Sequence, residues 1–459
     1  MNKPTIKLFN SLKRSVEEFI PIKENKISLY TCGPTVYDSS HIGHARSFIV
    51  WDCLVRFFRE IGYEVKWARN ITDIDDKIIN RSLELGIEPQ KLARIETYKY
   101  WRDMNNLNVQ WPDYEPKATE NLSQMFVFIE GLINKGFAYK ATNGDVYFKV
   151  SAFKDYGQLK NIKNEAENIS RLEDLNCKEN TSDFALWKAF DSNEYGFESP
   201  FGHGRPGWHL ECSAMIKNIF GETIDIHGGG EDLIFPHHEN EIAQSEALHS
   251  CQFSRYWIHN GMVLVNGRKM SKSEGNFVTI ESALKKYSGN AIRFFVLSAH
   301  YRQSVNYTEE ALQSAQNGIN KLFQIFAHDE KIEINKTNLN QNFIDNFHNY
   351  LAEDLNTACA LSIAFEIAKL INKSEGNITE LKNTLAYILS VLGFNFSEKP
   401  ISSFNENTQN SIVKLLLDIR NNARETKNFQ LADQIRLHFE KAGYKLKDST
   451  EGTDLICVN

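Results

Sequence analysis

The chain has 459 residues, which at roughly 150 residues per domain predicts about three domains. Its hydrophobic fraction of 42% is enough for a sizeable core and excludes a disordered protein. The 52 lysines and arginines against 59 acidic residues give a net charge of −7, which excludes non-specific nucleic-acid coating through bulk positive charge but not local basic patches. Seven scattered cysteines exclude a disulfide scaffold. With no secretory signal pattern and no apolar run of 18 residues, we expect a cytoplasmic protein without membrane contact.

The first part of the chain alternates strand and helix patterns. A β-branched and aromatic run at 26–32 predicts a strand that ends at Gly33-Pro34. Apolar residues at helical spacing predict a helix over 41–60, with a buried face formed by Ile49, Cys53, Leu54, Phe57 and Phe58. A second strand is predicted at 63–68. Strand, helix and strand in this order predict a βαβ unit in a parallel sheet, and hence an α/β fold.

The remaining elements follow in order along the chain. Residues 80–135 are predicted to be helical, and the strand pattern at 146–150, within a polar stretch, indicates an insertion rather than more of the first sheet. A strand at 224–227 is followed by three glycines and by a helix that opens near Pro236. Polar linkers are expected at 329–342 and 397–409, with continuous helix over 343–392 between them. Residues 412–459 predict one or two helices and then short strands.

A first candidate site is His41-Ile42-Gly43-His44, at the start of the first helix. Two imidazoles three residues apart share a helix face, a glycine permits close approach of a ligand, and a helix N-terminus favours phosphate. Such a site can stabilise a phosphoryl transition state. The four residues alone are equally compatible with two histidines that are satisfied in a core.

A second candidate is Lys269-Met270-Ser271-Lys272-Ser273, whose two lysines suit transient stabilisation of a polyphosphate. By itself this pentapeptide is better explained as an exposed basic turn. The two motifs together, in this order in an α/β chain, resemble the signature of class I aminoacyl-tRNA synthetases. That resemblance implies catalytic roles for His41, His44, Lys269 and Lys272.

Further motifs make the chain similar to the cysteinyl-tRNA synthetases in particular. They are Cys32-Gly-Pro-Thr-Val-Tyr-Asp38, Asn70-Ile-Thr-Asp-Ile-Asp-Asp76, Gly204-Arg-Pro-Gly-Trp-His-Leu-Glu-Cys-Ser-Ala-Met215, Asp225-Ile-His-Gly-Gly-Gly230 and Asp232-Leu-Ile-Phe-Pro-His-His-Glu-Asn-Glu241. The resemblance covers essentially the whole chain and is looser after residue 310. It implies ATP with Mg²⁺, L-cysteine and cysteine tRNA as substrates, and no obligate protein partner.

Metal-binding side chains recur within these motifs. Two thiolates, an imidazole and a carboxylate are sound zinc ligands, and His237 and Glu241 share a helix face at i, i+4. Spacing alone does not choose His237 over His238, and scattered cysteines are usually buried small apolar residues. The resemblance implies one Zn²⁺ per chain, held by Cys32, Cys212, His237 and Glu241, where it would recognise the substrate thiol.

The same resemblance assigns substrate contacts. It places Trp208 against the bound cysteine together with Gly33 and Thr72, although a core aromatic is the more common role for a tryptophan. Asp232 is expected to accept a hydrogen bond from a ribose hydroxyl. Close approach of the ATP is expected at Gly43 and Gly230, and Lys272 is expected to contact the phosphates.

The C-terminal region carries several cations near one predicted helix face. A solvated helix would explain them in an arbitrary protein, whereas the resemblance implies tRNA contacts, the residues being Arg420, Arg424, Lys427 and Arg436. The chain departs from the family here, since Phe429 stands where a tryptophan is usual and Leu455 lies where the family usually ends in Gly-Thr-x-Trp-Arg.

The expected architecture is a Rossmann-like class I catalytic domain split by an insertion, followed by two smaller domains, in a monomer. The expected bounds are 1–120 and 204–310 for the two catalytic halves, 121–203 for the insertion, 311–400 for a helical tRNA-binding bundle and 401–459 for an anticodon-binding domain. Two alternatives remain open: a cysteine ligase that acts on an amino sugar, which should lack the C-terminal domain, and a non-catalytic tRNA-binding paralogue, which need not keep both signature motifs.

Overall fold

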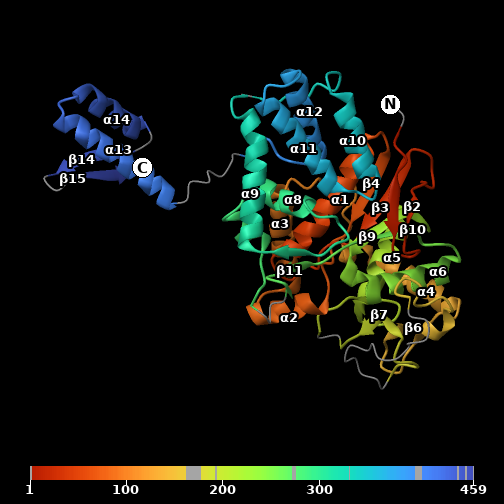
Figure 1. Cartoon of the computed structure of the whole chain (residues 1–459). Helices are drawn as coiled ribbons and strands as arrows, with labels where there is room; N and C mark the ends of the chain where they lie inside the picture. The colour runs from red at the N-terminus through yellow and green to blue at the C-terminus, as the bar shows by residue number, and fades with distance from the viewer. Residues whose placement is uncertain are drawn as a thin grey trace. The chain divides into compact units, whose positions relative to one another are not determined.

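The computed structural model of the chain divides into two compact units, Met1–Lys399 and Pro400–Asn459 (Figure 1). The residues described are 3–161, 177–191, 194–270, 275–329, 331–398, 406–441, 444–449 and 452–457. Within them, no helix is both long and apolar enough to cross a membrane.

The first unit is built on a four-stranded sheet in which every neighbouring pair is parallel. The strand order is β10-β9-β3-β4, with β3 at Lys26–Thr31, β4 at Glu64–Arg69, β9 at Ile224–Gly230 and β10 at Ser254–Asn260. Helix α1 (Ile42–Glu60) connects β3 to β4, because parallel neighbours need a crossover rather than a tight turn. The predicted βαβ unit and parallel sheet are therefore confirmed.

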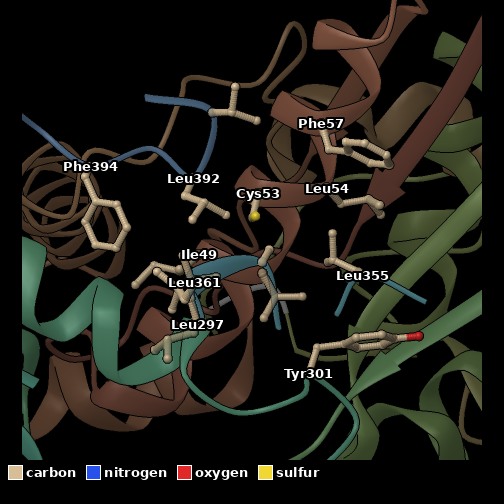
Figure 2. Close-up of a cluster of buried hydrophobic side chains, with 14 of the residues drawn as sticks. Ile49, Cys53, Leu54, Phe57, Leu297, Tyr301, Leu355, Leu361, Leu392 and Phe394 are labelled. Carbon is tan, nitrogen blue, oxygen red and sulfur yellow. The ribbon is translucent and has the colours of Figure 1, made fainter. Parts of the chain in front are cut away.

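Helix α1 supplies much of the core beside this sheet. All five of its predicted core residues are buried, and Figure 2 shows four of them, Ile49, Cys53, Leu54 and Phe57, among apolar side chains from distant parts of the chain. These partners include Leu297, at the end of α8 (Gly289–Leu297), and Leu361 in α11 (Thr357–Asn372). The apolar face of α1 thus joins the sheet to the helices that follow it.

The segment between β4 and β9 contains helices and a second sheet. The helices are α2 (Asp76–Leu85), α3 (Pro89–Asn106), α4 (Leu122–Asn134) and α5 (Trp208–Ile219). The second sheet is antiparallel, with β5 (Ala138–Lys140), β6 (Val146–Phe148), β7 (Phe184–Ala189) and β8 (Gly204–Pro206) in that order. It is separate from the parallel sheet, as predicted for an insertion. Strand β8 still belongs to it, so the expected boundary at 203/204 falls inside this sheet.

The helix predicted near Pro236 begins later than expected. Helix α6 runs over Glu239–His249, after short helical turns at Glu231–Leu233 and Ile234–His238. Phe235 is extended (φ −141°, ψ 134°), because the residue before a proline is pushed out of the helical region. The regular helix therefore starts three residues after Pro236.

A three-stranded sheet and a helical bundle complete the first unit, and a hairpin of β1 (Lys7–Asn10) and β2 (Ser15–Glu18) opens it. The sheet contains β11 (Val263–Val265), β12 (Arg268–Lys269) and β13 (Val305–Tyr307), and the helices are α7 (Ile280–Leu284), α8, α9 (Glu309–Phe323), α10 (Gln341–Ala352), α11 and α12 (Ile378–Val391). The continuous helix predicted over 343–392 is wrong in this respect: it is three helices. Asn356 and Asn377 cap α11 and α12, and asparagine favours caps over helix interiors.

The second unit is a pair of helices and a hairpin, as the sequence predicts. Helices α13 (Glu406–Glu425) and α14 (Phe429–Lys441) precede β14 (Tyr444–Ser449) and β15 (Gly452–Cys457), which pair antiparallel. Ile435, Phe439 and Leu446 form its small core. The linker expected over 397–409 ends no later than residue 405, and residues 399–405 lie outside the described part of the chain.

Candidate active site and metal centre

A cavity of about 590 Å³ lies where the strands of the parallel sheet end. Ligands of open parallel sheets bind at this carboxyl edge. Nine of the site residues predicted from the sequence line this one cavity, and they come from four separate parts of the chain: Cys32, Gly33, His41, Gly43, His44, Trp208, Gly230, Asp232 and Lys269. Lys77, which the sequence analysis did not single out, lines it as well.

His41 and His44 form a reciprocal pair at the N-terminus of α1. The backbone N–H of each donates to Nδ1 of the other, both at 3.3 Å, and the two rings stack with centroids 3.7 Å apart. A Cβ on Gly43 would lie 2.8 Å from a ring carbon of His41, so the stack requires glycine there. Because Nδ1 accepts in both rings, the neutral form of each carries its proton on Nε2, as a donor that suits a phosphate oxygen.

The charge state of His44 follows from its surroundings. Burial lowers the pKa of His44 well below its usual value, and the neighbouring His41 and Lys77 lower it further. His44 is therefore neutral at pH 7. Its contribution to a phosphate site is a hydrogen bond rather than a full charge.

The second motif starts beside the first. Lys269 is exposed at the end of β12, which pairs antiparallel with β11, and Met270 follows it along the cavity wall. The methyl group of Met270 would lie 3.5 Å from a Cβ on Gly43. Lys272 and the other residues of 271–274 lie outside the described residues, so its predicted role stays a prediction.

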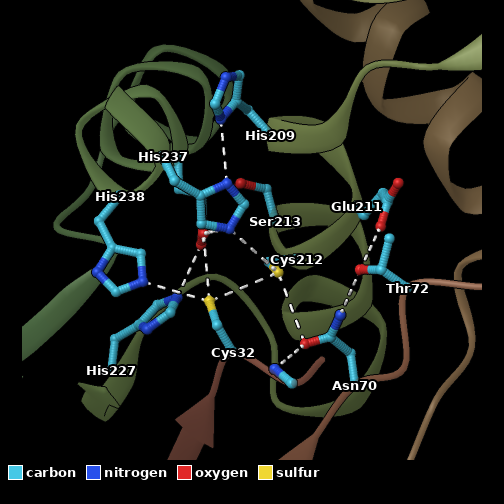
Figure 3. A network of polar contacts seen from close by, with 12 residues as sticks. Cys32, Asn70, Thr72, His209, Glu211, Cys212, Ser213, His227, His237 and His238 are labelled. Carbon is cyan, nitrogen blue, oxygen red and sulfur yellow. Dashed lines mark hydrogen bonds and ion pairs between the residues drawn. The ribbon is translucent and has the colours of Figure 1, made fainter. Parts of the chain in front are cut away.

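Next to the cavity, which Cys32 lines, the four predicted metal ligands converge, and Figure 3 labels three of them, Cys32, Cys212 and His237. Cys32 follows β3, Cys212 lies in α5, and His237 and Glu241 lie just before and within α6. Their ligand atoms all lie within 4.8 Å of one another: the two Sγ atoms are 3.8 Å apart, Cys212 Sγ is 3.7 Å from His237 Nε2, and His237 Nε2 is 2.8 Å from Glu241 Oε1. Tetrahedral zinc with bonds of 2.0–2.3 Å holds its ligand atoms about 3.3–3.8 Å apart. The donor set and the two distances to sulfur fit such an ion, whereas the 2.8 Å between His237 and Glu241 is a hydrogen-bond distance.

The charges of these groups also suit a cation. A hydrogen bond from Cys32 lowers the pKa of Cys212 to about 6 although burial opposes it, so Cys212 is a thiolate at neutral pH. Burial acts to raise the pKa of Glu241, but His227 and His237 lower it to about 2. A buried thiolate and a buried carboxylate side by side favour a divalent cation between them.

A second, overlapping set competes for the same place. Cys32, His227, His238 and Glu241 also place their ligand atoms within 4.8 Å, with His238 Nε2 at 3.2 Å from Cys32 Sγ and His227 Nε2 at 2.7 Å from Glu241 Oε2. The choice between His237 and His238 that the spacing leaves open is therefore open in the geometry too. If His237 is the ligand, the contact of His227 with Glu241 is the supporting hydrogen bond that metal-binding carboxylates usually have.

Two of the three predicted cysteine-binding residues, Gly33 and Thr72, are joined by a chain of hydrogen bonds through Asn70, which Figure 3 labels with Thr72. The N–H of Gly33 donates to Asn70 Oδ1 at 2.8 Å, Asn70 Nδ2 donates to Thr72 Oγ1 at 3.2 Å, and Thr72 Oγ1 donates to Glu211 Oε2 at 3.0 Å. A side chain at position 33 would overlap the backbone oxygen of Asn70, which explains the glycine. The order of donors leaves Thr72 with an acceptor lone pair for a substrate ammonium group.

Trp208 faces the cavity rather than the core, stacked on His237 with centroids 4.1 Å apart. Glu211, His227 and His238 are buried in this region and were not predicted as site residues. The sequence did contain a signal for them, namely the density of histidine over 209–259 and the acidic residue next to Cys212.

The predicted tRNA-binding cations lie in the second unit. Arg424 and Lys427 are exposed, and Arg436 is exposed with Nε 3.3 Å from Glu440 Oε1. Arg420 is 3% exposed, so it packs inside the unit and does not present its charge at the surface as predicted. Phe429 is 60% exposed.

Comparison with known proteins identifies the class that this fold and cavity define. Residues 18–317 match the catalytic domain of class I tRNA synthetases of the cysteine type, "tRNA synthetases class I (C) catalytic domain", and residues 346–397 match a DALR domain. Two solved structures share the fold: Mycobacterium tuberculosis methionyl-tRNA synthetase bound by methionyl-adenylate (TM-score 0.58, 16% identity, 80% of this chain and 90% of that one) and an Agrobacterium radiobacter K84 LeuRS in a ternary complex (TM-score 0.59, 13% identity, 82% and 84%).

Curated relatives narrow the class. The proteins named cysteine–tRNA ligase from Haemophilus influenzae (strain PittGG) and Methanococcus maripaludis (strain C7) are each 42% identical to this chain. The alignments cover 98% and 99% of this chain and 99% and 100% of those relatives. The chain belongs to the cysteine–tRNA ligase family.

Proposed function

We propose that the protein joins L-cysteine to cysteine tRNA in two steps, using ATP with Mg²⁺ and passing through cysteinyl adenylate. The observation that carries this proposal is the shared position of Cys32, which lines the cavity between the two signature motifs and also belongs to the buried ligand cluster. One cavity therefore offers groups for a nucleotide and for a thiol.

In the first step the cysteine carboxylate attacks the α-phosphorus of ATP and pyrophosphate leaves. No general base is needed, because the attacking carboxylate is already ionised. The imidazoles of His41 and His44 donate hydrogen bonds to phosphate oxygens, and Lys269 and Lys272 offset the charge that develops as pyrophosphate leaves. In the second step a terminal hydroxyl of the tRNA attacks the carbonyl carbon of cysteinyl adenylate, forming the cysteinyl ester while the anhydride bond breaks and AMP leaves.

The ligand cluster supplies amino-acid selectivity. A zinc ion held by Cys32, Cys212, His237 and Glu241 would lower the pKa of the substrate thiol and bind it as the thiolate. The acceptor lone pair of Thr72 receives a hydrogen bond from the substrate ammonium group, and Trp208 closes the side of the pocket. Asp232 accepts a hydrogen bond from the ribose, and Gly230 permits the nucleotide to approach.

The second unit gives the protein a place to read tRNA, which favours a tRNA acceptor over an amino sugar. Its exposed cations and the exposed ring of Phe429 suit phosphate contacts and base stacking. A cytoplasmic location is part of the proposal, supported by the free cysteines among the described residues.

The test is cysteine-dependent exchange of pyrophosphate into ATP, followed by charging of cysteine tRNA by the same preparation. We expect both reactions with cysteine and neither with serine. Exchange without charging would support the amino-sugar alternative, and absence of both would support a non-catalytic paralogue.

A further inference from the structure

The exposed face of α3 combines large aromatic side chains with positive charge. Lys91, Ile95, Tyr98 and Arg102 follow one another at spacings of three and four residues and so share a helix face, with Arg94 beside them. Tyr98 is 61% exposed, and Trp111, in the segment after the helix, is 57% exposed. Side chains of this size usually lie largely buried, so two exposed together indicate a contact surface. We call these residues, with Trp101, the α3 surface.

The two exposed rings are held in place by a third. Trp101 lies between them, with centroid distances of 5.4 Å to Tyr98 and 5.6 Å to Trp111. Its indole N–H donates to Glu115 Oε2 at 2.7 Å, which fixes the ring. Because Tyr98 and Trp111 are already packed against a fixed neighbour, they lose little conformational freedom when a flat ligand stacks on them.

Two exposed cations of this face have no acidic partner among the described residues, whereas Arg102 pairs with Asp103 and Glu281, both at 3.0 Å. The acids within α3 are Glu96 and Asp103, and both are buried, at 6% and 1% exposure. Lys91 and Arg94 are exposed, and neither forms an ion pair among the residues that the structure describes. An aromatic platform flanked by unneutralised cations fits a polyanion with flat faces, which describes RNA.

Helix α3 has its start near the cavity and its end near the last residues of the first unit. Near its start, Leu92 and Ala93 pack in one cluster with Val36, next to the segment 32–35 that lines the cavity. Beyond its end, Asn108 donates to the backbone oxygen of Gly393 at 2.7 Å, close to where the first unit ends and the chain continues to the second. Helix α3 and the segment after it therefore connect the neighbourhood of the cavity with residue 393, near the end of the first unit.

We propose that the α3 surface binds tRNA, with an unpaired stretch of the RNA stacked on Tyr98 and Trp111 and its phosphates held by Lys91 and Arg94. This rests on the proposed function and adds a contact region in the first unit to the one expected in the second. Adenylate formation should not depend on the α3 surface, because no residue of the α3 surface lines the cavity.

The test measures direct binding of cysteine tRNA to the full chain by filter retention or fluorescence anisotropy. Tyr98→Ala and Trp111→Ala should each raise the Kd for tRNA about tenfold, and Tyr98→Phe should retain near wild-type affinity because it keeps the ring. The double variant Lys91→Ala/Arg94→Ala should lower the slope of log Kd against log salt by about 1.4, at about 0.7 per phosphate contact to single-stranded RNA. Pyrophosphate exchange should be unchanged in all four.

A matched control is Tyr350→Ala, which removes a 40% exposed tyrosine from α10, outside this surface, and should leave the Kd unchanged. Unaltered tRNA affinity in Tyr98→Ala and Trp111→Ala overturns the proposal. The proposal is also overturned if these variants convert a dimer to a monomer while the affinity for tRNA stays unaltered. That result would identify the α3 surface as an interface between copies of the chain. A wild-type protein that binds tRNA through these residues but activates no cysteine refutes the proposed function alone.

Discussion

The buried ion pair between Asp52 and Arg293 should be a main determinant of the stability of the first unit. Asp52 lies in α1, is fully buried, and accepts hydrogen bonds from Arg56 Nε at 2.8 Å, from the backbone of Gln110 at 2.9 Å and from Arg293. Arg293, fully buried in α8, also donates to the backbone oxygens of Leu392 and Leu107 at 2.7 and 2.9 Å. The pair therefore ties the helix that carries His41 and His44 to the bundle.

Asp52→Asn keeps the shape of the side chain and removes its charge. Burial alone lowers the pKa of Arg293 to about 9, which shows how unfavourable this environment is for a charge. Removing one partner of a buried ion pair costs about 3–5 kcal/mol, because the other charge stays buried without compensation. Since Arg293 keeps its carbonyl partners, we expect the low end, about 3 kcal/mol. Glu353→Gln is the control: its pair with Lys7 is 59% and 46% exposed, and such pairs contribute about 0–1 kcal/mol.

Urea unfolding followed by tryptophan fluorescence measures both free energies. We expect the urea midpoint to fall clearly in Asp52→Asn and only slightly in Glu353→Gln. Both variants should retain pyrophosphate exchange at low temperature. A midpoint of Asp52→Asn equal to that of the control would refute the expected loss of stability. In that case the carbonyl oxygens around Arg293 would suffice to stabilise its charge.

Three further predictions concern the proposed reaction. The chelator-washed protein should retain one zinc per chain, and Cys212→Ser should raise the KM for cysteine much more than the KM for ATP. A metal-free protein that still excludes serine would contradict the role assigned to the ligand cluster. His44→Ala and Lys272→Ala should each lower the kcat of pyrophosphate exchange with little change in the KM for cysteine, because the two side chains act on charge that develops in the transition state. Unchanged exchange in both variants would show that neither side chain takes part. Deleting 401–459 should leave exchange largely intact and greatly reduce charging, whereas an equal loss of both would identify the second unit as a folding element.

Local patterns predicted the parts of the fold that local chemistry decides. The strand at 26–32, the helix over 41–60 and the next strand were recoverable from periodicity, because each buries one face against the same core. The start of α6 was misplaced since Phe235 must leave the helical region before Pro236. The burial of Arg420 was missed for a different reason: a cation at helical spacing looks the same in sequence whether its face meets solvent or the neighbouring helix α14.

The site divides in a similar way. Residues within continuous motifs, such as His41 and His44, could be paired by spacing, because one helix end positions both; for Glu241, spacing left His237 and His238 as alternative partners. The contacts of Glu211 with Thr72 and of His227 with Glu241 join residues from different elements, so only the folded chain brings them together. The ambiguity between His237 and His238 persists for a physical reason, since each imidazole lies within reach of one of the two thiol sulfurs.

The proposed ligand cluster would also give the protein a way to exclude serine. Cysteine and serine differ by one atom, and a pocket that distinguishes substrates by one methylene gains only about 1–3 kcal/mol. A hydroxyl is a poor ligand for a metal that thiolate binds strongly, so selection by ligation exceeds what shape can provide. Cys32 places that chemistry at the cavity wall, beside Gly33 and Trp208, where the side chain of a bound amino acid would point. If the proposed metal selects cysteine at this point, before the adenylate forms, a separate hydrolytic step to correct errors would not be needed.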